Sequence, residues 1–193
     1  MTTRRDAERP YAFRCMLADG LFAAYLALCN GLLRLPGHRF RIVVLRHLVR
    51  AQVGNRCAIE RGVRIMTRGR LRIGDGTNIN RHVLLDARGG LTIGRRVNIS
   101  PEVVLISAEH DPQSPIFAGR TRQVVVGDSV WIAYRALVLP GTDLGDGVVV
   151  AAGAVARGRI PARTIVAGNP AVPIGERDHA AQSTLERYRR FMH

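Results

Sequence analysis

One histidine, His110, occupies a position in the chain that differs from its surroundings. It lies in the segment Glu109-His110-Asp111-Pro112, inside the single large gap between otherwise regularly spaced aliphatic-glycine pairs. An imidazole titrates near neutral pH, so it can accept a proton from a reacting hydroxyl as a general base. A lone histidine is more often structural than catalytic, but an irregular segment inside a regular repeat favours catalysis. A neighbouring carboxylate, Asp111 or Glu102, or a backbone carbonyl would fix its tautomer.

The repeat that surrounds this histidine predicts the fold. Five aliphatic-glycine pairs recur at spacings of 20, 20, 33 and 18 residues. The pairs are Val53-Gly54, Ile73-Gly74, Ile93-Gly94, Val126-Gly127 and Leu144-Gly145. Inside each period a branched aliphatic recurs about every six positions, which is typical of a parallel β-helix. Each coil then has three short faces, with the aliphatic side chain inward and the glycine allowing the turn.

The repeat divides the chain into three parts. We expect an N-terminal helical, basic segment (residues 1–52), a parallel β-helix (residues 53–174) with a loop at 107–123, and a C-terminal tail or short helix (residues 175–193). The three-and-four spacing of an amphipathic helix is absent between residues 53 and 168. A β-sandwich with glycine turns is the alternative, and five pairs that agree in phase disfavour it. The expected fold class is an all-β solenoid with helices at its ends.

The N-terminal segment combines positive charge with apolar residues. The formal charge of the chain is +14, and residues 1–72 carry +11 of it, from 15 Arg against four acidic residues. Residues 11–35 and 40–51 are expected to be helical, with apolar stretches too short to span a bilayer. These helices either cap the open end of the solenoid or contact an anionic membrane surface through residues 11–50. The two roles are compatible.

Composition bounds the partners and the compartment. The chain has ten aromatic residues, and none is interleaved with the Arg-rich run, so a nucleic-acid partner is not expected. The three cysteines, Cys15, Cys29 and Cys57, are odd in number and lack a metal-binding spacing. No cleavable signal sequence is evident. The chain is therefore expected to be cytoplasmic, with peripheral contact at the inner membrane face as the extension, and to bind no metal.

The C-terminal half of the chain carries a specific resemblance. Its motifs are Val126-Gly-Asp-Ser-Val-Trp131-Ile-Ala, Val138-Leu-Pro-Gly141, Leu144-Gly-Asp-Gly147, Val150-Ala-Ala-Gly153 and Ala167-Gly-Asn-Pro-Ala171. They resemble the hexapeptide-repeat acyltransferases, and within these the sugar O-acetyltransferases of galactoside, maltose, nodulation-factor and exopolysaccharide type. The resemblance covers about residues 53–174. It implies a left-handed parallel β-helix, a homotrimer with active sites between subunits, acetyl-CoA as the donor and a hydroxylated, sugar-like acceptor.

The resemblance also implies roles for single residues. His110 matches the catalytic histidine, which would remove the hydroxyl proton as the hydroxyl attacks an activated acetyl thioester, so that transfer is direct. Asn80 and Asp86 resemble the residues that hold the acceptor sugar, with an Asn ladder or a turn Asp as the structural alternative. The expected acetyl-CoA contacts are Trp131, Ala133, Gly153, Ala154, Arg157 and Arg163.

Two departures from the family pattern concern the phosphates of coenzyme A. The chain has Arg157-Gly158 where the family usually has Thr-Lys, and Val172 where it usually has a cation. The cations that would then have to contact the phosphates are Arg157, Arg159, Arg163 or Arg177.

Other functions are left open by the residues. The acceptor could instead be an amino sugar, serine or an antibiotic, and a non-catalytic trimeric scaffold would use the same fold. A relative of the γ-class carbonic anhydrases would need three zinc-binding histidines. Only His82 and His110 lie on neighbouring coils, which disfavours that reading.

Overall fold

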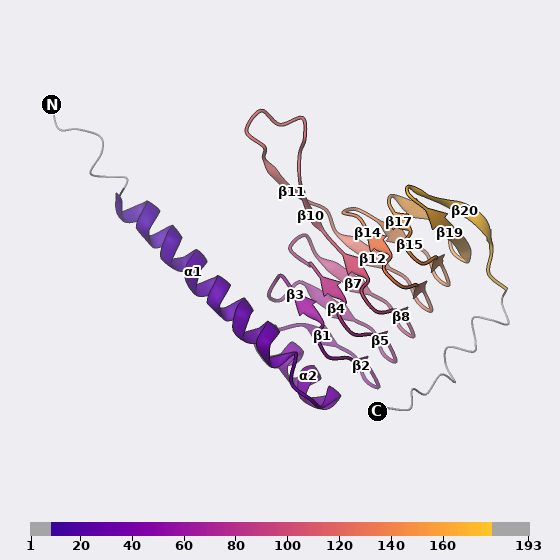
Figure 1. Ribbon diagram of the computed structural model, residues 1–193, viewed down its shortest axis with the longest axis horizontal. Helices are drawn as coiled ribbons and strands as arrows, with labels where there is room; N and C mark the ends of the chain where they lie inside the picture. The colour runs from indigo at the N-terminus through magenta and orange to yellow at the C-terminus, as the bar shows by residue number, and fades with distance from the viewer. Residues whose placement is uncertain (1–8, 179–193) are drawn as a thin grey trace.

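The protein is a parallel β-solenoid of about six turns, with helices at its N-terminal end (Figure 1). The computed structural model describes residues 9–178, with side chains from residue 18 onward. Each turn contributes one short strand to each of three sheets, so neighbouring strands in a sheet come from successive turns. The expected C-terminal helix falls within residues 179–193, which lie outside the described part of the chain.

The strands and helices are short and follow the repeat. The first sheet contains β1 (Gln52–Val53), β4 (Leu71–Ile73), β7 (Leu91–Ile93), β12 (Val124–Val126), β15 (Asp143–Leu144) and β18 (Arg159–Ile160). The second contains β2 (Ala58–Ile59), β5 (Asn78–Ile79), β8 (Asn98–Ile99), β13 (Trp131–Ile132), β16 (Val149–Val150), β19 (Thr164–Gly168) and β20 (Ala171–Glu176). The third contains β3 (Arg64–Ile65), β6 (Leu84–Leu85), β9 (Val104–Leu105), β14 (Leu137–Val138) and β17 (Val155–Ala156). A separate hairpin is formed by β10 (Ala108–His110) and β11 (Gly119–Thr121). The helices are α1 (Arg9–Leu32), α2 (His38–Val43) and the π-helix η1 (Val44–Leu48).

Columns of inward-facing aliphatic side chains form the core. In the first sheet each member pairs in register with the equivalent residue of the next turn, and each is at most 9% exposed. The column is Val53, Ile73, Ile93, Val126, Leu144 and Ile160. Full burial of such a side chain contributes about 1.5–3 kcal/mol relative to exposure. A coil achieves this burial only by stacking on its neighbours.

The glycine after each aliphatic residue is required for a different reason from the expected one. None of the five aliphatic-glycine pairs has its glycine at positive φ, so these glycines do not make the turn. A Cβ added at Gly94 would lie 2.6 Å from the carbonyl oxygen of Gly127 in the next coil. These glycines therefore permit the close approach of successive coils.

The turns are made by residues in the left-handed conformation. Between the first and second sheets, the residue three positions after each inward aliphatic has a φ between 55° and 70°. The six residues are Arg56, Gly76, Arg96, Ser129, Gly147 and Arg163. Because non-glycine residues adopt this region at a cost of about 1–2 kcal/mol, stacking of the coils must hold them there.

Three of the glycines that allow close approach of the coils are each followed by an aspartate. The carboxylates of these aspartates complete the corner between the first and second sheets. The Oδ1 atom of Asp75 accepts from the backbone N–H of Asn55 at 2.6 Å, and that of Asp128 accepts from Arg95 N–H at 2.8 Å. Asp146 repeats the contact with the N–H of Asp128 at 2.7 Å. These carboxylates satisfy backbone donors of the preceding coil that the strand ladders leave unpaired.

The N-terminal helices cover the open end of the solenoid. α1 packs on β3, α2 on β2 and η1 on β1, so each helix meets one strand of the first coil. The Asn30 side chain donates to the carbonyl oxygen of Ile65 at 3.0 Å and accepts from its N–H at 2.8 Å, as a further strand would. Arg46 Nη2 donates to the carbonyl oxygen of Val53 at 2.7 Å. The helices thus act as the cap that a solenoid end requires.

Arg41 is the buried member of this cap, at 6% exposed. Its Nε donates to the carbonyl oxygen of Ile59 in β2 at 2.8 Å, and its Nη1 donates to that of Leu35 at 2.7 Å. Burial lowers the pKa of its guanidinium. The side chain therefore joins the helical segment to the second sheet.

We expect Arg41→Met to lower the free energy of unfolding by about 1–3 kcal/mol, because the buried carbonyl of Ile59 loses its donor while the apolar contacts of the side chain remain. Urea denaturation at fixed protein concentration measures the loss. Arg39→Met, at an exposed neighbouring position, should change the value by less than about 0.5 kcal/mol. Equal losses of unfolding free energy in the two variants would show that the hydrogen bond from Arg41 to the Ile59 carbonyl is not stabilising.

The loop inserted in the third turn is an ordered hairpin that projects from the solenoid (Figure 1). Its strands pair antiparallel, with Ala108 opposite Thr121, and His110 opposite Gly119. The backbone N–H of Arg122 donates to the carbonyl oxygen of Ser107 at 2.8 Å, which closes the base of the hairpin.

The C-terminal end of the solenoid closes with an antiparallel pair. β19 and β20 pair from Gly168 opposite Ala171 to Thr164 opposite Glu176. β20 therefore continues two residues beyond position 174, where a tail was expected to begin. Arg177 Nη1 donates to the carbonyl oxygen of Ser129 at 2.8 Å, which ties this end to an earlier coil.

Candidate active site

His110 lies at the end of β10, and its ring is held in one orientation. Its Nδ1 lies 2.8 Å from the carbonyl oxygen of Phe117. Because a carbonyl oxygen can only accept, Nδ1 carries the proton of the neutral ring and Nε2 has a free lone pair. The exposed imidazole also stacks on the Phe117 ring, with centroids 4.2 Å apart and planes 6° apart. One nitrogen of an oriented histidine can therefore accept a proton from outside the chain.

Phe117 is itself held by the turn of the hairpin. Its φ of 51° lies in the left-handed region, which is unusual for a bulky residue. Its N–H donates to the carbonyl oxygen of Ser114 at 3.0 Å, and the Ser114 hydroxyl accepts from the N–H of Ala118 at 3.1 Å. A strained residue persists only where its surroundings determine it, and such residues cluster at functional sites. Sequence analysis misses Phe117, because its role depends on a backbone conformation.

The carboxylates expected to fix the histidine tautomer have other partners. Asp111 Oδ1 accepts from the N–H of Gln113 at 3.0 Å. Glu102 accepts from Arg135 Nε at 2.7 Å, and this hydrogen bond lowers the pKa of Glu102. Of the two alternatives that the sequence left open, the structure therefore has the backbone carbonyl, that of Phe117, and neither candidate carboxylate.

Asn80, a candidate for the acceptor site, lies inside the solenoid and is 5% exposed. Its amide nitrogen donates to the carbonyl oxygen of Ile99 and lies 3.3 Å from Asn98 Oδ1, both in the next coil. Such a contact between asparagines of successive turns stabilises stacking. The geometry favours the Asn-ladder alternative over a sugar contact.

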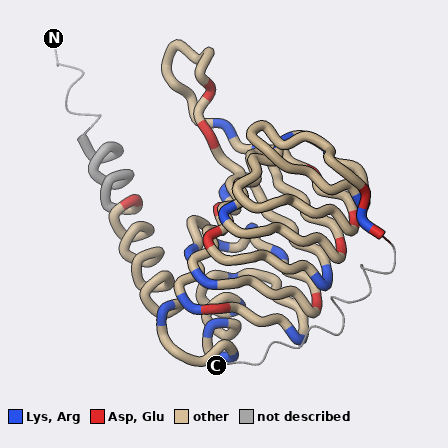
Figure 2. Tube along the Cα trace, turned by 45° about the vertical axis from the view of Figure 1, so that its right-hand side comes forward, with Lys and Arg blue, Asp and Glu red and all other residues tan. Residues whose placement is uncertain are grey.

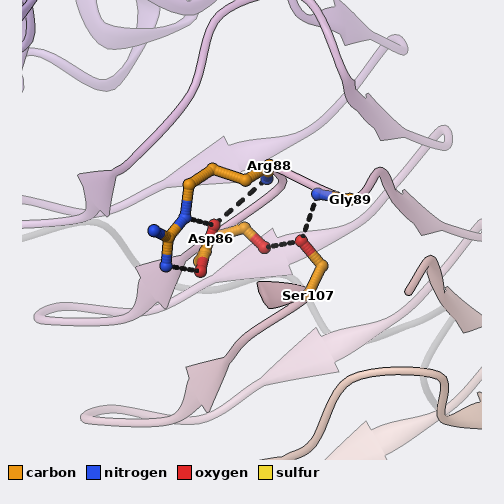
Figure 3. Close-up of polar contacts among 4 residues, drawn as sticks. All are labelled: Asp86, Arg88, Gly89 and Ser107. Carbon is orange, nitrogen blue, oxygen red and sulfur yellow. Dashed lines mark hydrogen bonds and ion pairs between the residues drawn. The ribbon is translucent and has the colours of Figure 1, made fainter. Parts of the chain in front are cut away.

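Asp86, the second acceptor candidate, is fully buried and forms a two-point pair with Arg88 (Figure 3). Arg88 donates from Nε at 3.0 Å and from Nη2 at 2.8 Å, and this contact raises the pKa of Arg88. Ser107 Oγ donates to the Asp86 carbonyl oxygen at 2.7 Å and accepts from the N–H of Gly89 at 2.8 Å. Since Ser107 directly precedes the hairpin, this cluster fixes the base of the segment that carries His110.

Arg88 is a polar residue of the candidate site that is not among the residues expected from the sequence. Its side chain is 50% exposed while its partner carboxylate is buried. The pair therefore presents a fixed guanidinium to solvent at the hairpin base, whereas the Asp86 carboxylate itself faces inward. The sequence signal that could have indicated this ion pair is the two-residue spacing between Asp86 and Arg88.

The small and aromatic residues expected to contact acetyl-CoA fall into two groups. Trp131 on β13 is 42% exposed, and its Nε1 donates to Ser100 Oγ at 3.1 Å. Gly153 is exposed at a corner, with no atom within 4 Å of an added Cβ. Ala133 and Ala154 are buried. A ligand can therefore touch the first two by their outer surfaces, and the alanines contribute mainly to packing.

The arginines expected to contact phosphates differ in whether they already have a partner. Arg157 is exposed and has no hydrogen bond or ion pair with any described residue. Arg163 pairs with Glu176 at 2.7 Å. Arg159 lies 3.9 Å from a carboxylate of β15, and Arg177 donates to backbone carbonyls of two coils, where burial lowers its pKa. Arg157 is thus the candidate that an anionic ligand can reach without breaking a contact.

His110 and Trp131 lie on different sides of one chain. The hairpin leaves the corner between β9 of the third sheet and β12 of the first, whereas Trp131 belongs to the second sheet. A site that uses both side chains therefore requires a second copy of the chain.

No protein-family model matches the chain, but curated proteins are similar to part of it. A protein of Escherichia coli strain K12 named as a lipopolysaccharide biosynthesis O-acetyl transferase, WbbJ, is 50% identical over 56 residues, which is 29% of each chain. The chain thus spans less than a third of the length of this relative.

Solved structures match more of the chain. A hexapeptide-repeat acetyltransferase of Vibrio cholerae, VCA0836, solved with acetyl coenzyme A, has a TM-score of 0.75 at 23% identity, over 82% of this chain and 88% of its own. A maltose O-acetyltransferase of Clostridium difficile 630 has a TM-score of 0.71 at 26% identity, over 82% and 89%. The homologues and structural neighbours are hexapeptide-repeat acetyltransferases, and the neighbours are left-handed β-helices. The expected fold class is therefore confirmed.

Two further findings concern metals and membranes. Within residues 9–178, no group of three His, Cys, Asp or Glu side chains is placed to hold a metal ion. No helix in the same range is long and apolar enough to cross a membrane.

Proposed function

We propose that the protein is an O-acetyltransferase that moves an acetyl group from acetyl-CoA to a hydroxyl of a sugar or glycoconjugate. The observation that carries the proposal is His110, whose Nδ1 donates to a fixed carbonyl and whose Nε2 is left as a base on an exposed, ordered hairpin. A scaffold would have no need to orient an exposed histidine in this way.

The chemistry requires one base. The acceptor hydroxyl oxygen attacks the thioester carbonyl carbon as His110 Nε2 takes the hydroxyl proton. Collapse of the tetrahedral intermediate breaks the carbon–sulfur bond, and the imidazolium returns the proton to the departing thiolate. The products are an acetyl ester and coenzyme A with a free thiol. Transfer is direct in this proposal, because the histidine acts as a base on the hydroxyl and is not itself acylated.

The sugar acceptor is supported by the names of the relatives. WbbJ is named for lipopolysaccharide biosynthesis and the Clostridium difficile neighbour for maltose, and both are O-acetyl transferases. We propose that Asn80 and Asp86 shape the acceptor end of the site from within the coils and that Arg88 presents the outward polar group. Release of coenzyme A thiol in a screen of sugars tests the acceptor class, and transfer only to amines would contradict it.

We expect Phe117→Ala to lower kcat by about 2- to 10-fold, because a stacking contact of about 0.5–1.5 kcal/mol that orients the imidazole is lost. Phe117 would act as a positioning residue, so the affinity for acetyl-CoA should not change. Ile174→Ala, at a 64% exposed apolar position of β20, is the control. A weaker acetyl-CoA affinity at unchanged kcat would place Phe117 in donor binding instead.

We propose that Trp131, Ala133, Gly153, Ala154, Arg157 and Arg163 form the acetyl-CoA site, with Arg157 at the phosphates. We expect Arg157→Ala to raise the Kd for acetyl-CoA by about 3- to 10-fold, the loss of one charge-assisted contact. Arg64→Ala, an exposed arginine of the first coil, serves as the control. If the Kd for acetyl-CoA is equally sensitive in both variants, Arg157 does not meet the phosphates.

We also propose a homotrimer with its active sites between subunits. Placement of His110 and Trp131 on different sides of one chain supports it. So does the hairpin tip, where Ile116 and Phe117 are 83% and 63% exposed and would be covered by a neighbour. Three equivalent contacts close a cyclic assembly. Light scattering should give three times the chain mass, and a monomer that transfers acetyl groups would contradict the shared site.

The proposal includes a cytoplasmic location, where acetyl-CoA is available, and peripheral contact with the inner membrane face through residues 11–50. Cell fractionation tests the location.

A further inference from the structure

The N-terminal cap carries a concentration of exposed apolar side chains. Of the thirteen large apolar side chains exposed in the described chain, seven lie between residues 21 and 48. We call these seven the cap surface: Leu21, Phe22, Leu28, Leu35, Phe40, Val43 and Leu48. A concentration of exposed apolar side chains in one segment indicates an interaction site.

α1 contributes a segment that no described residue covers. It extends beyond the solenoid in both views (Figures 1 and 2). Every residue from 18 to 24 is exposed, so no single face of this part of the helix packs on the coils. Between Ala18 and Leu33 the only charged residue is Asp19. A helix that is apolar on all sides belongs in an apolar environment, yet α1 is not long and apolar enough to cross a membrane.

Arginines surround the base of this apolar helix. Figure 2 shows basic segments gathered on the first coils, beside the end of α1 that joins the solenoid. The exposed arginines of the cap and the first coils include Arg34, Arg39, Arg50, Arg61, Arg64, Arg68 and Arg70. The Arg68 guanidinium lies 5.5 Å from the centroid of the Tyr25 ring of α1, so charge and apolar surface are contiguous. An apolar helix beside a cluster of cations is the composition of an interfacial membrane anchor.

We propose that the cap surface docks on an anionic lipid bilayer, with α1 lying in the interface and the surrounding arginines against the lipid headgroups. A second copy of the chain fits less well. Two caps in contact would bring together segments of +11 each over residues 1–72, and like charges at close range repel. Anionic headgroups instead complement these charges.

Docking in this orientation places the hairpin near the bilayer. Successive coils are about 4.8 Å apart, and the hairpin leaves the third turn, so its base lies roughly 10 Å above the first coil. A glycan carried on a lipid anchor would then reach His110 without leaving the membrane. This acceptor class rests on the proposed acetyl transfer, whereas the docking surface does not.

The test is co-sedimentation of the full chain with phosphatidylcholine vesicles, with and without phosphatidylglycerol, at low and high salt. We expect binding only to the anionic vesicles, and weakening of it by salt. The triple variant Leu21→Gln, Phe22→Gln and Leu28→Gln should bind at least about tenfold more weakly. The matched control is Val172→Gln with Ile174→Gln, an exposed apolar pair at the opposite end of the solenoid, and it should bind as the wild type does.

The same proteins are also examined by light scattering and for acetyl-CoA affinity. No binding of the wild type to anionic vesicles, or equal losses in both sets of variants, would overturn the docking surface. A triple variant that changes oligomeric state would show that a second copy covers the cap surface, which would also overturn it. Acetyl-CoA affinity should be unchanged throughout, so failure of docking and failure of the enzymatic proposal are distinguishable.

Discussion

His110→Ala is expected to lower kcat/KM for acetyl transfer by about 10²- to 10⁴-fold, which is the usual contribution of a general base. The hydroxyl of a sugar is hardly ionised at neutral pH, so it must lose its proton as it attacks the thioester. Nε2 of His110 is the basic atom that the hairpin presents, because Nδ1 is engaged by the Phe117 carbonyl at 2.8 Å. Steady-state release of coenzyme A thiol with a sugar acceptor measures the effect.

The matched control is His47→Ala, at an exposed histidine of η1, which should leave kcat/KM unchanged. His110→Gln keeps a side chain that can form hydrogen bonds but cannot act as a base at neutral pH, so it should be as slow as the alanine variant. A loss of less than about tenfold in both substitutions at this position would remove the histidine from the reaction.

Gly94→Ala is expected to lower the free energy of unfolding by about 3 kcal/mol or more. Its Cβ would lie 2.6 Å from the carbonyl oxygen and 2.7 Å from the carbonyl carbon of Gly127. Both neighbours are backbone atoms of the next coil, so no side-chain rotation relieves the contact, and the coils must separate. Urea denaturation followed by circular dichroism, at one protein concentration because assembly affects stability, measures the loss.

Gly31→Ala is the matched substitution with the opposite expected sign. Gly31 lies in α1, and no atom is within 4 Å of an added Cβ. Alanine lowers the conformational entropy of the unfolded chain and favours helix, so stability should rise by a few tenths to about 1 kcal/mol. If Gly94→Ala loses no more stability than Gly31→Ala, the close approach of successive coils does not explain the glycines of the repeat.

The fold could be predicted because its signal is local and periodic. An inward aliphatic every six residues defines the strands, and the one long gap between Ile93 and Val126 locates the hairpin. The reason for the glycines could not be predicted in the same way. Contact between Gly94 and the next coil depends on how the coils stack, and a sequence pattern does not separate a close approach from a left-handed turn.

The conformation of the corner residues and the contacts of the N-terminal cap could not be predicted either, because they depend on how the coils stack. Arg56 and Ser129 occupy left-handed positions that the neighbouring coils impose, and their residue types give no sign of it. The sequence indicated a capping or membrane segment, but the way Asn30 and Arg41 complete the first strands depends on positions distant in sequence. Leu28 in α1 is exposed while Leu33, directly after the helix, is buried, which only packing decides.

Part of the candidate site likewise could not be predicted from the sequence. His110 was identified because it interrupts a repeat, but its partner is the carbonyl of Phe117 rather than Asp111 or Glu102. A backbone carbonyl has no signature in a sequence. Asp86 was named because it resembles an acceptor-binding residue, but its carboxylate is fully buried and paired with Arg88.

The measurement that tests the central claim most directly is a calorimetric titration of the full chain with acetyl-CoA, in the wild type and in His110→Ala. We predict micromolar binding at about one site per chain, retained in the variant, because the histidine acts on the acceptor and the donor contacts lie on other coils. Absence of binding in both proteins would contradict acetyl-CoA as the donor, and the assignment of Trp131 and Arg157 to its site would be the first to fall.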